Sequence, residues 1–286
     1  TIATGNAADP SIKAEKLFSL FYGELCKSLI GSHRVVRFAY DWRRPLQETA
    51  VELATRLKAL LQETAASGQP VRLLAHGMGG LVVRALVKTD EPLWNELMGR
   101  SGARFVMLGT PNQGSHQMVE TLLGKSDLIR KLARIDSRHS MQQILTIMAG
   151  FPGLLQLLPK PGFREAGDVQ QRDDYFQAGV WEELKQLNHD RWTGDGTAAT
   201  PSKAVLDQSR WLWDQESPEL PERHKQKVIY VYGQASITPC SLLEQNDRLK
   251  MLGTPAGDGA VTWASGPIPG IGSFYAMPVE HAALCN

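Results

Sequence analysis

The spacing of apolar residues in the first part of the chain predicts helices that alternate with strands. Between Ile12 and Ile30 leucine and phenylalanine recur at helical intervals, which predicts a helix that ends at Gly31. The apolar, β-branched run VVRFAYDW follows and predicts a buried parallel strand. From Leu46 to Ala66 apolar positions again recur every three or four residues between chain breakers. This pattern predicts an amphipathic helix.

The segment VRLLAHGMGGLVVRALV, Val71 to Val87, combines both periodicities. It predicts a strand at Val71–Leu74, a turn of small residues, and a helix that opens near Gly80 and runs to about Lys88. Another buried strand is predicted within Arg104–Pro111. Strands and helices that alternate in this way are typical of a parallel sheet covered by helices.

The pattern changes between His116 and Lys227, where the βαβ alternation stops. This region carries apolar helical segments, proline–glycine breaks and most of the tryptophans, so we predict an inserted, mainly helical cap. KVIYVYG, Lys227 to Gly233, then predicts a buried strand, and a shorter strand is expected at Ala260–Ala264 before the final segment FYAMPVEHAAL. The whole chain is therefore expected to be one α/β domain, with a core of residues 1–116 and 227–286 and a cap of about 117–226.

Composition narrows the possible partners. The 31 basic residues nearly balance the 30 acidic ones, so the net charge argues against nucleic acid or an anionic membrane as a partner. There is no apolar run long enough to predict a transmembrane helix. Three widely spaced cysteines, Cys26, Cys240 and Cys285, argue against a disulfide framework and are compatible with a reducing compartment such as the cytoplasm, although one pair remains possible. No histidine or cysteine spacing indicates a metal site, and we expect no cofactor.

The turn inside Val71–Val87 has the spacing of a nucleophile elbow, in which a nucleophile stands between small residues at the end of a strand. Gly77 occupies the nucleophile position here and has no atom that can attack. The backbone N–H of Met78 would be one donor of an oxyanion hole. The loop that normally supplies the second donor is not visible in the sequence, unless Thr1–Asn6 is its remnant.

A catalytic acid and a histidine follow the elbow in the order that this fold requires. Asp258 lies in AGDGAVTWAS and His281 in MPVEHAAL. We expect His281 to accept the nucleophile's proton and Asp258 to hold the imidazole in the required tautomer. Asp195, in a second GDG, is an alternative acid that falls inside the predicted cap. The alternative histidines are His33, His76, His116, His139, His189 and His224, of which His76 is expected to be structural.

Five short motifs carry a family resemblance, and they occur in the order YDWR, AHGMGG, LGTPNQGS, LLQLLP and GDGAV. With the histidine after MPVE, they resemble the lecithin–cholesterol acyltransferase-like branch of the α/β-hydrolases. The resemblance implies an α/β-hydrolase fold and a Ser–Asp–His triad that acts on lipid-like acyl esters, as a lipase, esterase or acyltransferase. It also implies that the cap shapes an apolar acyl pocket, with Leu154, Leu155, Leu157 and Leu158 as candidate substrate contacts.

Three features of the chain depart from that family pattern. Gly77 stands where a serine is expected, the second oxyanion loop is not visible, and the chain ends five residues after His281. We therefore expect a portion of a longer polypeptide, with flanking domains or a protein partner. Glycine adopts the strained elbow conformation freely, so the replacement stabilises the fold while it removes the attack. Deliberate removal of a serine explains the retained Asp258 and His281 better than natural loss does, but a natural pseudo-hydrolase that binds a lipid or a protein remains the alternative.

Other segments also admit two interpretations. GMGG after a strand could be a phosphate loop, but it lacks the last glycine of the dinucleotide fingerprint. LLGKSD has Val119 where a P-loop glycine belongs. Asp41, Trp42 and Arg43 could line a pocket, although a buried ion pair is favoured. Ile144–Leu158 could be a lipid-facing lid, although packing against the core is favoured.

Overall fold

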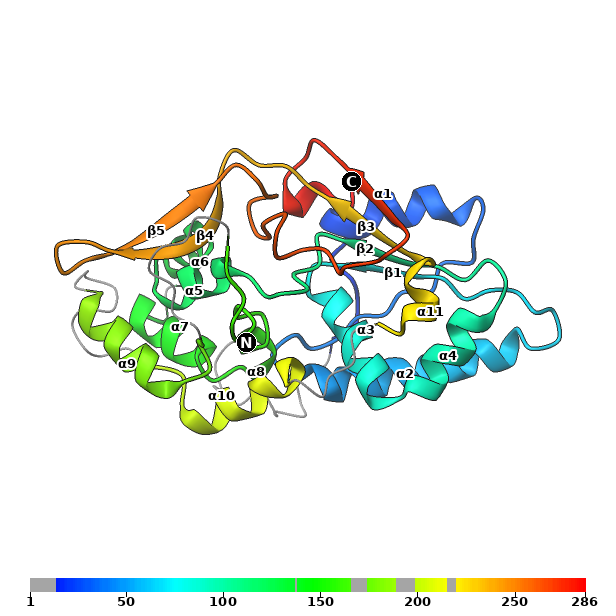
Figure 1. Ribbon diagram of the computed structural model, residues 1–286, viewed down its shortest axis with the longest axis horizontal. Helices are drawn as coiled ribbons and strands as arrows, with labels where there is room; N and C mark the ends of the chain where they lie inside the picture. The colour runs from blue at the N-terminus through cyan, green and yellow to red at the C-terminus, as the bar shows by residue number, and fades with distance from the viewer. Residues whose placement is uncertain (1–13, 137, 166–173, 189–198, 215–219) are drawn as a thin grey trace.

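The structure is a computed structural model that describes residues 14–136, 138–165, 174–188, 199–214 and 220–286. Figure 1 shows a parallel sheet with its helices on one side of the view, and a group of helices with a two-stranded hairpin on the other. The sheet contains four parallel strands in the order β1-β2-β3-β6. These strands are β1 (Leu73–His76), β2 (Phe105–Leu108), β3 (Val228–Tyr232) and β6 (Ser273–Ala276).

Two hydrophobic clusters cover the two faces of the sheet. The larger one buries Phe105, Met107 and Tyr230 against three helices, α2 (Leu46–Glu63), α3 (Met78–Thr89) and α4 (Glu91–Gly99). The smaller one packs Leu108 and Val231 against the C-terminal segment and α1 (Ser19–Ile30). A parallel sheet with helices on both faces is the architecture that the alternating sequence pattern predicted, and the prediction is confirmed.

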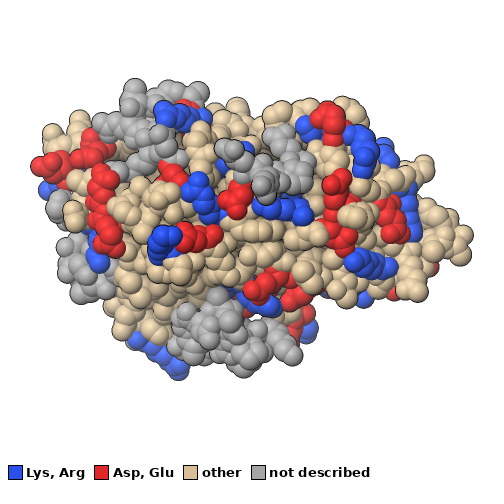
Figure 2. Space-filling model, turned by 60° about the horizontal axis from the view of Figure 1, so that its bottom comes forward, with Lys and Arg blue, Asp and Glu red and all other residues tan. Residues whose placement is uncertain are grey.

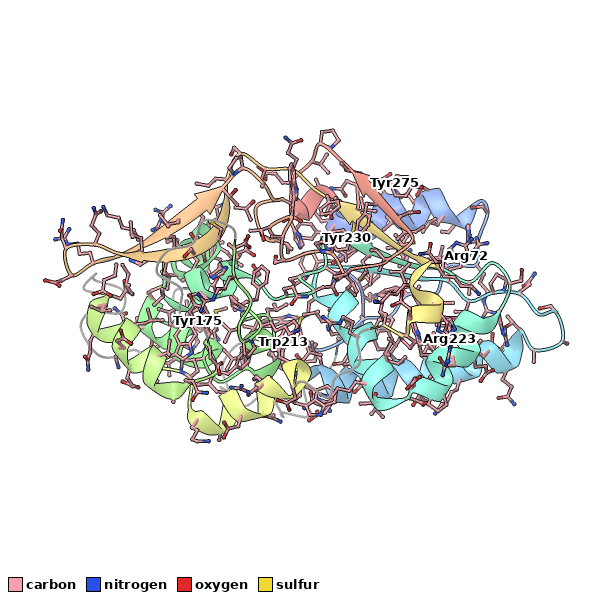
Figure 3. All side chains as sticks on the ribbon, viewed as in Figure 1. Arg72, Tyr175, Trp213, Arg223, Tyr230 and Tyr275 are labelled. Atoms are coloured by element: carbon pink, nitrogen blue, oxygen red, sulfur yellow. The ribbon has the colours of Figure 1, made fainter. Side chains whose placement is uncertain are left out.

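Most of the helices between β2 and β3 form the second group in Figure 1, together with the hairpin of β4 (Thr238–Glu244) and β5 (Leu249–Thr254). These helices are α5 (His116–Leu122), α6 (Asp127–Ile135), α7 (Met141–Met148), α8 (Pro152–Leu155), α9 (Ala178–Leu187), α10 (Lys203–Arg210) and the 3₁₀ turn η1 (Trp211–Trp213). Tyr175 and Trp213 lie among these helices, whereas Tyr230 lies in the sheet (Figure 3). The short helix α11 (Glu222–Lys225) lies instead beside the sheet, where His224 contacts Trp94 of α4. The helical content predicted after His116 is therefore present.

Glycine permits one close contact between the two groups. A Cβ on Gly153, in α8, would collide with the backbone oxygens of Trp42 and Arg44, and its N–H donates to the carbonyl of Arg43 at 3.1 Å. Arg43 in turn forms a two-pronged ion pair with Asp41, at 2.8 and 2.6 Å, in which both side chains are largely buried. The buried ion pair is thus confirmed, whereas the indole of Trp42 is 45% exposed and contacts Phe151 edge-on.

Two predicted strands are wrong. Val35–Asp41 forms no strand among the described residues, because its apolar side chains pack partly against the core while its backbone pairs with no neighbouring strand there. Ala260–Ala264 is a loop with one isolated bridge, between Gly257 and Thr262. Ala260 and Val261 of that loop are buried by tight turns and not by a ladder of backbone bonds, and Ala264 is exposed.

The β4–β5 hairpin was not predicted. Its connection places Asn246 and Asp247 at φ 52° and 55°, the left-handed conformations of a two-residue hairpin turn. The predicted first helix is also shorter, since residues 14–18 are not helical and α1 begins at Ser19.

Acidic and basic side chains are interspersed on the surface shown in Figure 2, in keeping with the near balance of charge in the sequence. Arg44, for example, bridges Glu48 and Glu52 along α2. Among the described residues, no helix has the length and hydrophobicity needed to cross a bilayer.

Candidate active site

Gly77 lies at the sharp turn between β1 and α3. Its backbone has φ 51° and ψ −122°, a conformation that is essentially restricted to glycine in the absence of compensating contacts. Its N–H donates to the carbonyl of Leu108 at 2.9 Å, which ties the turn to the neighbouring strand. Behind it, a Cβ on Gly80 would collide with the side chain of Thr110, so glycine lets α3 approach the loop after β2. The strand–turn–helix geometry of a nucleophile elbow is therefore present.

The structure places the three predicted residues side by side in the order Gly77, His281, Asp258. His281 Nδ1 lies 2.7 Å from Oδ2 of Asp258. On the other side of the ring, a Cβ built on Gly77 would lie 3.0 Å from Nε2 of His281. The imidazole thus stands between the carboxylate and the empty side-chain position, which is the arrangement that a proton relay from residue 77 requires.

Backbone contacts hold Asp258 in place. Its Oδ1 accepts from the amides of Ala260 at 2.9 Å and Val261 at 2.7 Å, and its side chain is almost fully buried. Its own carbonyl accepts from the backbone N–H of His281 at 2.8 Å. The acid loop and the histidine segment are therefore fastened to each other by main chain as well as by the side-chain pair.

Two glycines that the sequence analysis did not single out make room for this pair. A Cβ on Gly109 would lie 2.7 Å from Oδ2 of Asp258 and 2.8 Å from Nδ1 of His281. A Cβ on Gly233 would lie 2.7 Å from Cβ of Asp258. Each comes directly after a strand of the sheet: Gly109 follows FVML and Gly233 follows VIYVY. A glycine at the end of a predicted strand was therefore the signal that could have identified them.

His76 packs against His281 and hydrogen-bonds to its backbone. Its Nε2 donates to the carbonyl of His281 at 2.9 Å, and its ring centroid is 4.5 Å from that of His281. With the proton on Nε2, Nδ1 can accept from the hydroxyl of Tyr22, 3.2 Å away. Burial, and then repulsion by His281, lowers the pKa of His76 to about 4, so it is neutral at pH 7. The expected structural role of His76 is consistent with these contacts.

This depressed pKa makes stability depend on pH. The unfolded chain binds a proton at His76 near pH 6.5 and the folded chain only near pH 4, so the free energy of unfolding should fall as pH is lowered through that window. The loss is about 3 kcal/mol by pH 4. In His76→Gln, whose amide can still donate to His281, urea unfolding between pH 7 and pH 4 should show a flatter profile. An unchanged slope would contradict the assignment.

Met78 is the first residue of α3, where a helix leaves its N–H groups without an acceptor inside the helix and presents the positive end of its dipole. That position suits the predicted oxyanion donor. The second predicted source, Thr1–Asn6, lies outside the described residues.

The alternative acid and histidines are elsewhere. Asp195 and His189 lie outside the described residues. Among the others, His139 pairs with Asp136, and His33 contacts Arg72. His116 packs against Tyr175 and His224 against Trp94. Among the described residues, no group of histidine, cysteine and carboxylate side chains has a metal-binding arrangement, and Cys26 and Cys285 are buried as free thiols.

The four leucines that were candidate substrate contacts belong to the packed interior. Leu155 and Leu158 are fully buried, Leu154 is nearly so, and Leu157 packs partly buried against the same cluster. The carbonyl of Leu157 accepts from the N–H of Ser115, and Leu158 lies against Gly114. In this conformation the segment packs against the loop after β2, as the favoured interpretation of Ile144–Leu158 expected.

A comparison with one solved structure agrees with this fold. One chain in the solved Tle4–Tli4 complex is similar to it with a TM-score of 0.55 and 16% sequence identity, over 86% of this chain and 64% of that one. The mature Bacillus licheniformis lipase BlEst2 gives a TM-score of 0.40 and 13% identity, over 85% of this chain and 69% of the lipase. The present chain therefore spans less than two thirds of the first matched structure. A search of curated protein sequences gives no significant match.

The family model described as lecithin:cholesterol acyltransferase matches residues 17–193, which is more than half of the chain and includes the elbow. The chain belongs to the lecithin:cholesterol acyltransferase family, a family of lipase- and acyltransferase-like α/β-hydrolases.

Proposed function

We propose that this chain is the catalytic domain of a serine-type hydrolase or acyltransferase for lipid-like acyl esters, in a form from which the nucleophile is missing. One observation carries the proposal. His281 is held by Asp258 at 2.7 Å and presents Nε2 3.0 Å from the place where a side chain at position 77 would begin. The contact of His281 with Asp258 also fastens two segments of the chain, but only a nucleophile at position 77 explains why Nε2 faces the elbow.

The chemistry follows from the geometry. A serine at position 77 attacks the ester carbonyl while Nε2 of His281 accepts its proton, and the Met78 amide donates to the oxyanion. Asp258 keeps the proton on Nδ1 and stabilises the imidazolium. His281 then returns the proton to the leaving alcohol, and water or another alcohol releases the acyl group. With Gly77 no acyl-enzyme forms, so the chain as given is inactive in this proposal.

The retained pair also supports deliberate removal of the serine over decay. Asp258, His281 and the glycines that make room for them are all in place, although a chain without a nucleophile gains nothing catalytic from them. We further propose that residues 117–226 act as the cap of one domain and that the complete protein has flanking parts or a protein partner. The matched structure of Tle4 in complex with Tli4 is an example of this fold bound to another chain.

The substrate class is tested by Gly77→Ser and a series of p-nitrophenyl esters from acetate to palmitate. We expect hydrolysis across the series, with kcat/KM increasing with chain length because each buried methylene contributes about 0.8 kcal/mol. A preference for acetate would contradict a lipid substrate while leaving the esterase intact.

The alternative is a natural pseudo-hydrolase that binds a lipid or a protein. It predicts that Gly77→Ser folds, as judged by circular dichroism, yet hydrolyses no ester of any chain length. That outcome would replace the enzymatic proposal with the binding module.

A further inference from the structure

The second group of elements carries a surface that the catalytic proposal does not use. In α6 only Ile129 is fully buried, while Leu128 and Ile135 are 60% and 81% exposed. They are seven residues apart and so lie on the same side of the helix. Two large aliphatic side chains are thus left in solvent on one short helix.

Basic residues flank these two side chains. Between Lys125 and Arg138 the chain has five basic residues and two acidic ones, which is a local charge of +3 against +1 for the whole chain. Lys131 falls between Leu128 and Ile135 on the helix, and Arg130 and Arg134 lie on its outer side, all exposed. The overall charge balance that argued against an anionic membrane therefore conceals a basic segment.

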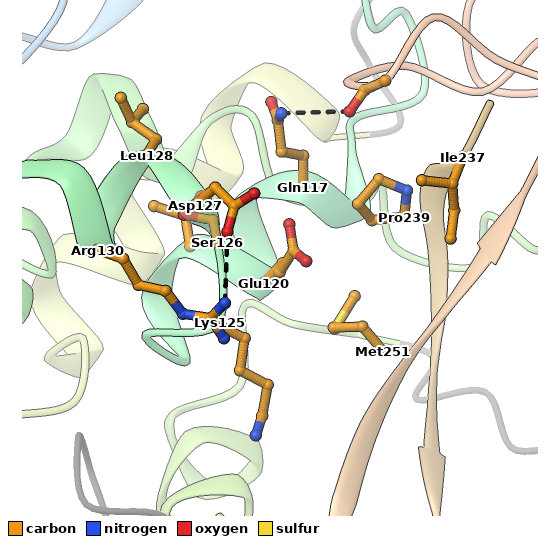
Figure 4. Close-up of a pocket in the computed structure, with 12 residues that line it drawn as sticks. Gln117, Glu120, Lys125, Ser126, Asp127, Leu128, Arg130, Ile237, Pro239 and Met251 are labelled. Atoms are coloured by element: carbon orange, nitrogen blue, oxygen red, sulfur yellow. Dashed lines mark hydrogen bonds and ion pairs between the residues drawn. The ribbon is translucent and has the colours of Figure 1, made fainter. Parts of the chain in front are cut away.

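A hollow of about 920 Å³ adjoins α6, between α5 and the β4–β5 hairpin (Figure 4). Leu128 and Arg130 line it on one side, and Ile237, which is 66% exposed, and Met251 line it on the other. Gly259, the neighbour of Asp258, also lines it. The hollow thus connects Leu128 and Ile237 with the loop that holds the candidate acid.

We propose that Leu128, Ile135 and Ile237, with Arg130, Lys131 and Arg134, form a docking surface for an anionic lipid bilayer. We call these six residues the α6 face; five of them lie on α6, and Ile237 comes directly before β4. Aliphatic side chains enter the boundary between headgroups and acyl chains, and the cations contact anionic headgroups, as in amphipathic helices that lie in a membrane surface. The positive charges favour an anionic partner. Charges alone would also suit an acidic protein or a nucleic acid, but the aliphatic residues between them favour a lipid bilayer.

This docking extends the proposed function, because a bilayer would present lipid esters to the enzyme, but binding requires neither the nucleophile nor the triad. It is measured with the present Gly77 chain, by co-sedimentation with phosphatidylcholine vesicles that contain or lack 30% phosphatidylglycerol. We expect strong binding only to the anionic vesicles, weakened as salt screens the charges.

Two variants separate the contributions of the positive charges and of the aliphatic side chains to vesicle binding. Arg130→Ser/Lys131→Ser/Arg134→Ser should lower the partition coefficient roughly 100-fold, at about five-fold for each charge removed. Leu128→Ser/Ile135→Ser should also lower it at least ten-fold, because the aliphatic contact is lost. The matched control Lys27→Ser/Arg56→Ser/Arg223→Ser removes three exposed charges elsewhere and should bind nearly as the parent does.

Absence of vesicle binding, or equal weakening by the control, would overturn the proposal. If Leu128→Ser/Ile135→Ser bound as tightly as the parent, the surface would be a site for polyanions such as an acidic protein, and the bilayer would be wrong. Failure of the proposed function looks different: Gly77→Ser would then hydrolyse no ester, whether or not the α6 face binds vesicles.

Discussion

Gly77→Ser is expected to gain ester hydrolysis and to lose stability at the same time. Removing the nucleophile from a serine hydrolase costs about 10⁶-fold in kcat, so restoring it should raise turnover of p-nitrophenyl butyrate about 10⁴- to 10⁶-fold over the Gly77 chain. The serine must also adopt φ 51° and ψ −122°, which costs about 1–3 kcal/mol. Its Cβ would lie 3.0 Å from Nε2 of His281, so the ring must shift by a few tenths of an ångström.

Gly77→Ala is the matched control for this result. It brings the same backbone strain and the same Cβ contact, but no hydroxyl. Urea unfolding should therefore show a similar loss of stability for the alanine and serine variants. Assays with p-nitrophenyl butyrate should show turnover for the serine variant alone. Equal activity in the two variants would show that residue 77 is not the nucleophile.

In the Gly77→Ser background, Asp258→Asn is expected to lower kcat about 10⁴-fold with little change in KM. Oδ1 of Asp258 accepts from two backbone amides, so the asparagine must keep its oxygen there and turn its NH₂ group toward His281. Nδ1 of His281 then has to accept a hydrogen bond, which places the proton on Nε2. In that tautomer Nε2 cannot accept the proton of the serine.

Asp195→Asn, in the same background, provides the comparison, because Asp195 lies in the other GDG of the sequence. We expect its kcat to remain that of the parent. If Asp195→Asn lowered kcat as much as Asp258→Asn, or if Asp258→Asn lowered it less than ten-fold, Asp258 would not be the acid that orients His281.

Much of the core followed from local patterns. The apolar runs of β2 and β3 and the periodic helices α2 and α3 were predictable because each is buried on at least one side by neighbours close in the chain. The strand predicted at Val71–Leu74 is displaced to Leu73–His76, and its Leu74 is 43% exposed. Strand pairing is harder to predict, since it depends on a partner. Val35–Asp41 has the composition of a buried strand, yet it pairs with no strand among the described residues.

The hairpin shows the opposite case. Pro239 and Cys240 interrupt the alternation in β4, and the register slips between Pro239 and Ser241. A period of two is therefore weak in the sequence although the two strands pair over most of their length. The turn at Asn246 and Asp247 was the remaining local signal.

The sequence predicted those residues of the candidate site that lie in recognisable motifs. Gly77, Asp258 and His281 follow from the elbow and from chain order, and the structure places them side by side. Gly109 and Gly233 were missed because their purpose is to leave space beside Asp258, which depends on contacts between strands remote in sequence. The contact of His76 with the carbonyl of His281 joins residues 205 positions apart and has no local signature.

The most direct test of the account is covalent. Gly77→Ser is treated with an alkyl p-nitrophenyl phosphonate, and the intact protein and its peptides are weighed by mass spectrometry. We expect one phosphonyl group per chain, attached at position 77, together with stoichiometric release of p-nitrophenol, and no adduct on the Gly77 or Gly77→Ala chain. Failure of a folded Gly77→Ser protein to react, or an adduct at any other residue, would contradict the claim that His281 and Asp258 serve a nucleophile at the elbow.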